Sequence, residues 1–388
     1  MAPKKTPSRR EPRRIAVLTG GGDCPGLNAV IRAVVKTAEN EHGWHVFGVR
    51  DGFEGFLVAA DRGISRLDRR DIAGILPQGG TILGASNRCN LFAVERKGRV
   101  TDESWRVADT MARLRLDALI TIGGEGTHKA AARLAATGVR VVGVPKTIDN
   151  DLGGTDVTFG FDTAVGVATE AVDRLHSTAA SHHRVMCVEV MGRHAGWIAL
   201  HAGLAGGADA ILLPEIPYDP DRLATRIASR VRHGRRFSIV VVAEGAKRAG
   251  GAPVFRRGKG EDPILDRLGG VSLLVAKEIE ERLAVSVRTT VLGHVQRGGS
   301  PSAADRVLAS RFGVRAVRAV ADGESGVMVA LRGTDVTTVP IEEAVATLKT
   351  VDPAGELVRA ARHLGITFGA ADGSDDAHTA ARRRHGAP

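Results

Sequence analysis

The stretch Val144-Pro145-Lys146-Thr147-Ile148-Asp149-Asn150-Asp151 decides how the rest of the chain is interpreted. The apolar residues 141–144 predict a buried strand of a parallel sheet, and Pro145, which cannot donate to a ladder, ends it. A lysine, a hydroxyl and two carboxylates follow within a few residues. Ligands of open α/β sheets bind beyond the carboxyl ends of the strands, so this loop could take a proton from a substrate hydroxyl or hold a metal. The alternative is a polar turn closed by Asx hydrogen bonds.

The composition indicates a globular protein. Of the 388 residues, 43% are hydrophobic and 25% charged, which is typical of two or three globular domains. No run of 18 apolar residues occurs, so no membrane span is expected. Residues 1–14 are basic and lack the apolar core of a signal peptide, and residues 370–388 are rich in His, Arg and Ala. Both segments are predicted to be disordered tails.

The three cysteines, Cys24, Cys89 and Cys187, are odd in number and widely spaced. They favour neither a disulfide framework nor a zinc site and indicate a cytoplasmic location. Cys24 lies in a glycine loop, where a helix N-terminus could lower its pKa. An incidental small residue at that position is the simpler interpretation.

The net charge of +10 permits nucleic-acid binding. The arginines, however, are scattered, and many lie in the two tails. Charged tails are ordinarily solvated, so their charge does not require a nucleic-acid partner. Phosphorylated substrates explain the arginines within the fold better, so nucleic acid is not expected as a partner.

Strands alternate with helices along the chain. Residues 15–19 predict a strand that runs through a glycine loop into a helix beginning near Leu27, and residues 117–122 predict another, followed by a helix over 128–137. The same alternation predicts further strands at 45–49, 184–190, 210–213, 237–243 and 287–292, and further helices at 162–179, 270–282 and 302–321. Such alternation is typical of parallel sheets with right-handed crossovers.

Five separated motifs stand in one order along the chain. They are residues 20–23 (GGGD), 123–127 (GGEGT), the octet 144–151, 191–193 (MGR) and 293–301 (GHVQRGGSP). Together they resemble the phosphofructokinase family over about residues 14–321. Any one of them alone would be weak, whereas five in order are specific.

The resemblance implies an α/β fold of two similar three-layer, Rossmann-like domains with mainly parallel sheets. The active site would lie in the cleft between them. The larger, donor-binding domain would comprise residues 15–160 and 296–345, and the smaller, sugar-phosphate-binding domain residues 161–295 and 346–369. The family also implies a homotetramer, with a dimer as the alternative.

The activity implied is that of a 6-phosphofructokinase of glycolysis, which moves the γ-phosphoryl group of ATP to the 1-hydroxyl of fructose 6-phosphate and leaves fructose 1,6-bisphosphate and ADP. Asp149 would accept the hydroxyl proton, with Asp151 and Thr147 orienting substrate and metal, and Arg193 would stabilise the moving phosphoryl group. Substrate-binding residues implied by the family are Thr147, Asp149, Arg184, Met191, Gly192, Arg193, Glu244, Arg288, His294 and Arg297. Arg184 and Arg288 would reach a neighbouring subunit's site.

The donor would be held by the glycine loops and by cations. The residues implied are Gly21, Arg88, Gly124, Glu125, Gly126, Thr127 and Lys146. Glu125 stands where the family usually has aspartate and would bind Mg²⁺. The family spacing for the donor-phosphate arginine falls on Asn87, so Arg88 is the neighbouring candidate.

Gly126 and Lys146 favour different phosphoryl donors. Pyrophosphate-dependent members carry aspartate where this chain has Gly126, and that carboxylate would repel the α-phosphate of ATP. Lys146, in contrast, is typical of pyrophosphate users. An aspartate at position 126 would exclude ATP by size and charge, whereas a lysine at position 146 only adds a cation. The glycine therefore outweighs the lysine, and ATP is favoured. The alternatives are a pyrophosphate-dependent fructose 6-phosphate 1-phosphotransferase and a non-catalytic sugar-phosphate-binding or nucleic-acid-binding protein on the same scaffold.

Overall fold

The computed structural model describes residues 13–371, except residues 88, 97, 252–254, 257–266 and 269. The chain divides into two compact units. Unit 1 comprises residues 1–163 and 297–348, and unit 2 residues 164–296 and 349–388. The predicted fold class, α/β with mainly parallel sheets, is confirmed in both units.

Unit 1 is built on a seven-stranded sheet in the order β15-β14-β7-β6-β1-β2-β3. The five central strands are parallel, whereas β15 and β3 run antiparallel at the two edges. In sheet order the bounds are β15 Asp335–Pro340, β14 Val327–Arg332, β7 Val141–Pro145, β6 Ala118–Gly123, β1 Arg14–Thr19, β2 His45–Val49 and β3 Ile64–Leu67. The β14–β15 hairpin, closed at Gly333 with φ 58°, was not predicted.

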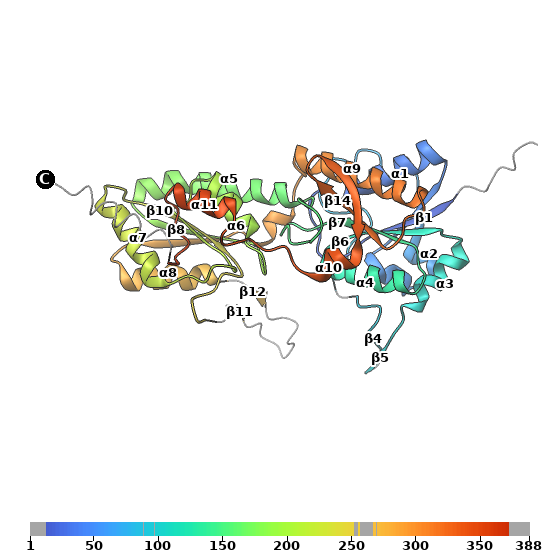
Figure 1. Ribbon diagram of the computed structural model, residues 1–388, viewed down its shortest axis with the longest axis horizontal. Coiled ribbons are helices and arrows are strands. Elements are labelled where there is room, and N and C mark those ends of the chain that lie inside the picture. The colour runs from blue at the N-terminus through green and yellow to red at the C-terminus, as the bar shows by residue number, and fades with distance from the viewer. Residues whose placement is uncertain are drawn as a thin grey trace, which may run out of the picture. The chain divides into compact units, whose positions relative to one another are not determined.

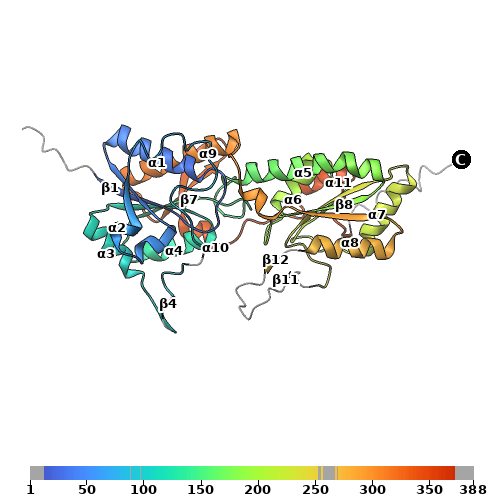
Figure 2. The same cartoon turned by 180° about the vertical axis from the view of Figure 1, so that it is seen from behind.

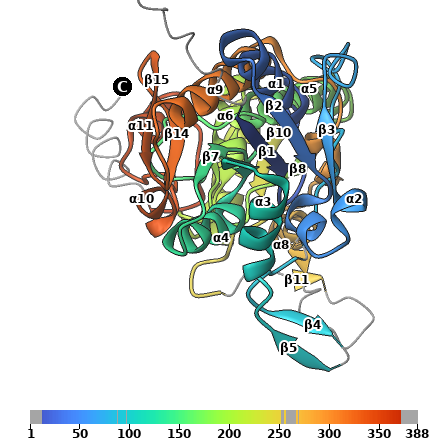
Figure 3. The ribbon, with the colours of Figure 1, turned by 90° about the vertical axis from the view of Figure 1, so that its right-hand side faces the viewer.

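Helices cover both faces of this sheet. On one face lie α1 (Leu27–His42) and α9 (Ala303–Ala321), which pack against each other, as Figure 1 shows. On the other face, α3 (Trp105–Leu114), α4 (Glu125–Ala136) and α10 (Ile341–Ala346) share one apolar cluster with the strands. The short elements are η1 Gly52–Phe56, α2 Ala60–Gly63, β4 Val94–Arg96 and β5 Arg99–Thr101, the last two forming the hairpin that projects beside α3 in Figure 3.

Unit 2 contains a smaller, wholly parallel sheet in the order β13-β8-β10-β9. The strands are β13 Val287–Val291, β8 Val185–Val190, β10 Ser238–Ala243 and β9 Ala210–Leu212. Figure 2 shows α5, α6 and α11 on one face and α8 on the other, where α7 joins it. These helices are α5 Phe161–His182, α6 Trp197–Ala205, α7 Pro220–Arg232, α8 Val271–Arg282 and α11 Glu356–His363. The remaining elements are β11 Phe255–Arg256, β12 Arg267–Leu268 and η3 Gly293–Arg297.

The predicted elements are present, with boundaries that shift by at most three residues. α4 begins at Glu125 rather than His128, because Gly124 in an extended conformation already starts the helix and places the Glu125 charge at its N-terminus. β1 begins at Arg14, inside the segment predicted to be a tail; residues 1–12 and 372–388 lie outside the described residues. Among the described helices, none is both long enough and apolar enough to cross a membrane.

Candidate active site

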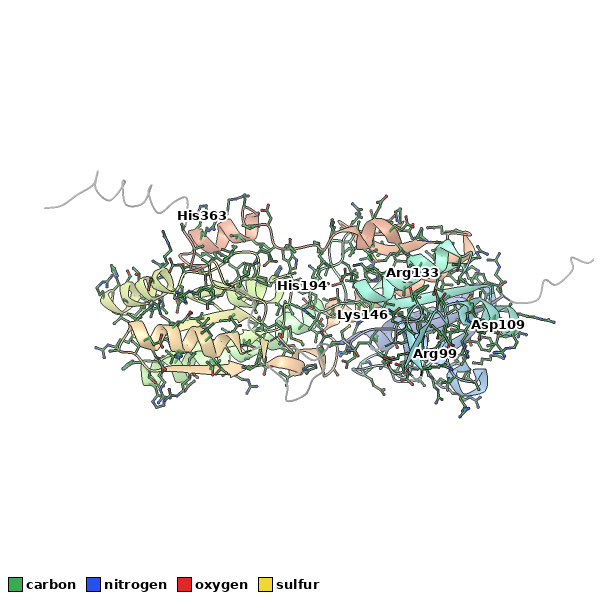
Figure 4. All side chains as sticks on the ribbon, turned by 90° about the horizontal axis from the view of Figure 1, so that it is seen from below. Arg99, Asp109, Arg133, Lys146, His194 and His363 are labelled. Atoms are coloured by element: carbon green, nitrogen blue, oxygen red, sulfur yellow. The ribbon has the colours of Figure 1, made fainter. Side chains whose placement is uncertain are left out.

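A pocket of about 540 Å³ opens where β1, β6 and β7 end in unit 1. The glycine loop after β1, the first turn of α4 and the segment after β7 all contribute to its lining, and Figure 4 marks Lys146 and Arg133 on this unit. The lining residues are Gly20, Gly21, Gly22, Phe53, Ser86, Asn87, Cys89, Asn90, Phe92, Gly124, Gly126, Thr127, Lys129, Ala130, Arg133, Lys146, Thr147 and Arg297. Parallel strands end at a common edge of the sheet, so motifs that are distant in the sequence meet here.

The glycine loop is held by hydrogen bonds to its backbone. The Gly21 N–H donates to the carbonyl of Ser86 over 3.0 Å, the Lys146 ammonium donates to the Gly22 carbonyl, and the Arg297 guanidinium donates to the Asp23 carbonyl over 3.1 Å. The Gly21 N–H therefore already has a protein partner. Gly21 contributes space instead: its φ is 75°, and an added Cβ would lie 3.4 Å from the Lys146 ammonium.

Lys146 is a buried cation in the pocket wall. The side chain is 4% exposed, and burial lowers its pKa. The nearby Cys24 thiol, Asp23 and Asp149 act in the opposite direction, whereas Arg297 reinforces the lowering. An ammonium that is already removed from water can bind an anionic ligand without the full desolvation cost of an exposed lysine.

The loop that carries Asp149 is a polar turn whose hydrogen bonds are made by its neighbours. The Asp149 N–H donates to Thr147 Oγ1 over 3.0 Å, and Thr158 Oγ1 donates to the Thr147 carbonyl over 2.7 Å. Asn150 adopts φ 51°, a conformation that asparagine tolerates well, and its Oδ1 accepts from the Thr158 N–H over 3.1 Å. The predicted turn therefore exists, but the hydrogen bonds that close it do not involve the Asp149 carboxylate.

The Asp149 carboxylate is set up to accept a proton. Within the part of the chain that the structure describes, its Oδ1 is buried without a hydrogen-bond partner. Burial, and then the charge of Asp151, raise the pKa of Asp149 to about 6, while Arg297 and Lys146 act against the rise. A carboxylate with a pKa near the working pH is ionised yet basic, which is what general-base catalysis requires.

The first turn of α4 faces the pocket through its small residues. A Cβ added at Gly126 would find open space, since no atom outside its chain neighbours and the adjoining helix backbone lies within 4 Å of it. Thr127 is buried against the preceding glycines: a Cβ on Gly20 would approach its Oγ1 to 2.6 Å, and one on Gly123 would approach its Cβ to 2.3 Å. Glycine at positions 20 and 123 therefore allows Thr127 to lie in the pocket wall.

Glu125 is the carboxylate that the family resemblance implies as a magnesium ligand. It lies outside the pocket lining, and its Oε1 accepts from the Lys129 ammonium over 2.5 Å. The described residues hold no cluster of three or more His, Cys, Asp or Glu side chains that could bind a metal alone. Mg²⁺ in phosphoryl-transfer sites is usually held by one or two carboxylates together with substrate phosphates, and a single Glu125 fits that chemistry.

Unit 2 places a second group of predicted residues at the carboxyl ends of its strands. Met191, Gly192 and Arg193 follow β8, Glu244 follows β10 and His294 follows β13. Arg193 and His294 are exposed, whereas Met191 is buried.

Gly192 and Gln296 shape this edge of the sheet. Gly192 must be glycine, because its φ is 136° and an added Cβ would lie 2.7 Å from the Ala195 carbonyl. The Met191 N–H donates to Gln296 Oε1 over 3.3 Å. The backbone that carries Arg193 is therefore fixed by neighbours on both sides.

Arg184 and Arg288 lie at the opposite end of the same sheet. Arg184 directly precedes β8, and Arg288 is the second residue of β13, paired with Met186 near the start of β8. The structure therefore brings Met191, Arg193, Glu244 and His294 to one edge of unit 2 and leaves these two arginines at the other. Arg297 joins the pocket of unit 1 instead.

Arg88 lies outside the described residues. The three cysteines are free, and the suggestion of a lowered Cys24 pKa is wrong, because burial raises the pKa of this thiol to about 12. Sequence reasoning missed the outer wall of the pocket, where the Arg133 guanidinium lies 3.5 Å from the centroid of the Phe92 ring.

One sequence signal pointed toward that wall. Lys129 and Arg133 follow Glu125 at four-residue intervals, the spacing that places side chains on one face of a helix. The contact with Phe92 could not be found in this way, because Phe92 is far from α4 in the sequence.

Comparisons with known proteins agree on the family. The family model described as phosphofructokinase matches residues 14–320. The ATP-dependent 6-phosphofructokinase of Chloroflexus aurantiacus is 54% identical over 92% of this chain and 98% of its own length. The pyrophosphate–fructose 6-phosphate 1-phosphotransferase of Streptomyces coelicolor is 55% identical over 92% of this chain and 100% of its own length. The solved T-state phosphofructokinase of Pichia pastoris matches with a TM-score of 0.76 and 34% identity, over 88% of this chain and 36% of that one.

Proposed function

Because the chain belongs to the phosphofructokinase family, we propose that it transfers a phosphoryl group from ATP to the 1-hydroxyl of fructose 6-phosphate, giving fructose 1,6-bisphosphate and ADP. The observation that carries the proposal is Asp149, a carboxylate with a pKa of about 6 and an unpartnered buried oxygen, judged among the described residues. Asp149 takes the proton of the 1-hydroxyl while the hydroxyl oxygen of the sugar attacks the γ-phosphorus of ATP. The bond between the γ-phosphorus and the ADP oxygen breaks in the same step.

The charge of the moving phosphoryl group requires cations. Lys146 and Arg297 line the donor pocket of unit 1, and the family resemblance assigns the same role to Arg193. Glu125 would hold Mg²⁺ together with donor phosphate oxygens, and the ion supplies neutralisation of the donor's negative charge. Thr147 and Asp151 flank the base, and Thr147 fixes its backbone through the hydrogen bond to the Asp149 N–H.

Fructose 6-phosphate is assigned to the residues of unit 2. Arg184, Arg288 and His294 supply cations for the 6-phosphate, and arginine suits this because its planar fork binds two phosphate oxygens at once. Met191 and Glu244 contact the sugar. Since Arg184 and Arg288 lie at the edge of the sheet opposite Arg193, we propose that they serve the site of a neighbouring chain in a homotetramer.

Gly126 favours ATP as the donor. Open space beside its Cα leaves room for the part of ATP that extends beyond the β-phosphate. A pyrophosphate-dependent transferase is the second candidate, because the buried Lys146 supplies the cation typical of that class and the relatives divide between the two donors. A non-catalytic scaffold is disfavoured, since a binding protein has no need of a base tuned near neutrality.

One assay decides between these functions. Purified protein is given fructose 6-phosphate and Mg²⁺ with ATP or pyrophosphate, and fructose 1,6-bisphosphate is measured. We expect product with ATP and a kcat/KM for ATP above that for pyrophosphate. Product with pyrophosphate alone assigns the second function, and no product with either donor overturns both.

A further inference from the structure

The carboxylate of Glu54 has no place in the reaction described so far. Glu54 lies in η1, and its Oε1 accepts a hydrogen bond from the Ser86 hydroxyl. The neighbouring Phe53 lines the donor pocket, as do Ser86 and Cys89. The Glu54 charge also helps to raise the pKa of the Cys89 thiol, after burial. Glu54 therefore lies behind the pocket wall, close to Ser86 and Cys89, which belong to one lining segment.

Ser86 connects this carboxylate to the glycine loop. Its carbonyl accepts from the Gly21 N–H over 3.0 Å, and residues 20 and 86 form an isolated parallel bridge. The backbone just before it is fixed as well, because the Gly84 carbonyl accepts from Thr19 Oγ1 over 2.5 Å. Ser86 thus makes two hydrogen bonds that connect Glu54 to the glycine loop. Its hydroxyl donates to Glu54, and its carbonyl accepts from the Gly21 N–H.

We propose that Glu54 is a positioning residue for the phosphoryl donor. By holding Ser86, it fixes the pocket wall that contains Asn87, Cys89 and Asn90 against the glycine loop, at the distance that the donor phosphates require. Glu54 does not line the pocket, so it acts through Ser86 and not by touching the donor. This inference rests on the proposed function only for the identity of the donor.

The tests use whichever donor the wild-type protein accepts. Glu54→Ala should raise the KM for the donor about tenfold, the effect of losing one charge-assisted hydrogen bond, and leave the KM for fructose 6-phosphate within twofold. Glu54→Gln keeps an acceptor oxygen and should restore the donor KM to within about threefold of wild type. Ser86→Ala should reproduce Glu54→Ala, and the double variant should be no worse than either single variant.

Glu324 supplies the matched control. It is also a partly buried glutamate of unit 1 that accepts from a hydroxyl, Thr338 Oγ1, over 2.6 Å, and it lies outside the donor pocket. Glu324→Ala should lower the melting temperature without changing the donor KM.

Each outcome then decides the proposal. An unchanged donor KM in Glu54→Ala, equal rises for both substrates, or additive effects in the double variant would overturn it. If Glu54→Ala fails to fold, Ser86→Ala and Glu54→Gln decide it by the same criteria. If wild-type protein shows no phosphoryl transfer, the proposed function fails on its own. Calorimetric binding of ATP and of pyrophosphate to wild type and Ser86→Ala then tests the positioning role, and equal affinities for both ligands in the two proteins overturn it.

Discussion

The two units place cations at the carboxyl ends of parallel strands, but in different environments. In unit 1, Lys146 is buried and already bonded to the glycine loop, and Arg297 binds the Asp23 carbonyl. In unit 2, Arg193 and His294 are exposed. The cations of unit 1 are therefore fixed by contacts inside one chain, whereas these two side chains of unit 2 are exposed to solvent. Variants in unit 1 should therefore affect chemistry and donor choice, and variants in unit 2 the affinity for the sugar phosphate.

The largest effect is expected at the base in unit 1. Asp149→Asn should lower kcat by about 10²–10⁴, because an amide cannot accept the hydroxyl proton. Steady-state kinetics measure the loss, and direct binding of fructose 6-phosphate should remain close to wild type. Turnover near the wild-type value would move the base to Asp151 or elsewhere and remove the chemical role assigned to unit 1.

The donor switch at Gly126 should be nearly as large. An aspartate there would enter open space beside the donor, and like charges about 4 Å apart repel by roughly 4 kcal/mol at an effective dielectric near 20. Gly126→Asp should therefore cut kcat/KM for ATP sharply and raise the ratio of kcat/KM for pyrophosphate over ATP. Gly126→Ala is the control, since it adds volume without charge. Full ATP activity in Gly126→Asp would show that this glycine does not admit the nucleotide.

A smaller effect is expected from the arginines of unit 2. Arg184→Ala or Arg288→Ala should chiefly raise the KM for fructose 6-phosphate, by about 10- to 100-fold, through the loss of charge-assisted bonds worth roughly 1.5–3 kcal/mol each. Arg232→Ala, on the exposed side of α7, serves as the control.

Mixing subunits tests whether the site is shared. Hybrids of the inactive Arg184→Ala and Asp149→Asn chains should regain activity if one chain supplies the base and its neighbour the arginine. Absence of activity in hybrids shown to have formed would place Arg184 in its own chain's site or in none.

The smallest effect is a shift in the pH profile. Asp149 is protonated below its raised pKa of about 6, so kcat/KM should fall about tenfold for each pH unit below that value. Asp151→Asn removes the second cause of the rise, so its acidic limb should move to lower pH. Asp109→Asn, an exposed change on α3, should leave the limb in place. An unshifted limb in Asp151→Asn would mean that burial alone sets the basicity of Asp149.

Local patterns in the sequence predicted the alternating strands and helices and the family, and both are confirmed. Continuous apolar runs mark β1, β6 and β7 because each strand is buried on both faces. The β14–β15 hairpin was missed although β14 carries the apolar run 327–331, and its partner β15 is more polar and only partly buried. The roles of individual site residues remain proposals that the variants above address.

The sequence by itself determined which chemical groups end each strand, because strand, turn and helix signals depend on residues a few positions apart. Only the tertiary structure decided what those groups touch. Lys146 donates to Gly22, more than a hundred residues away in the sequence, and Glu54 is joined to Gly21 through Ser86. Such contacts depend on how far each strand extends before its loop turns, and on burial that raises the pKa of Asp149 and lowers that of Lys146. The burial of a charged side chain depends on the whole packed unit, so no local pattern of residues specifies its pKa.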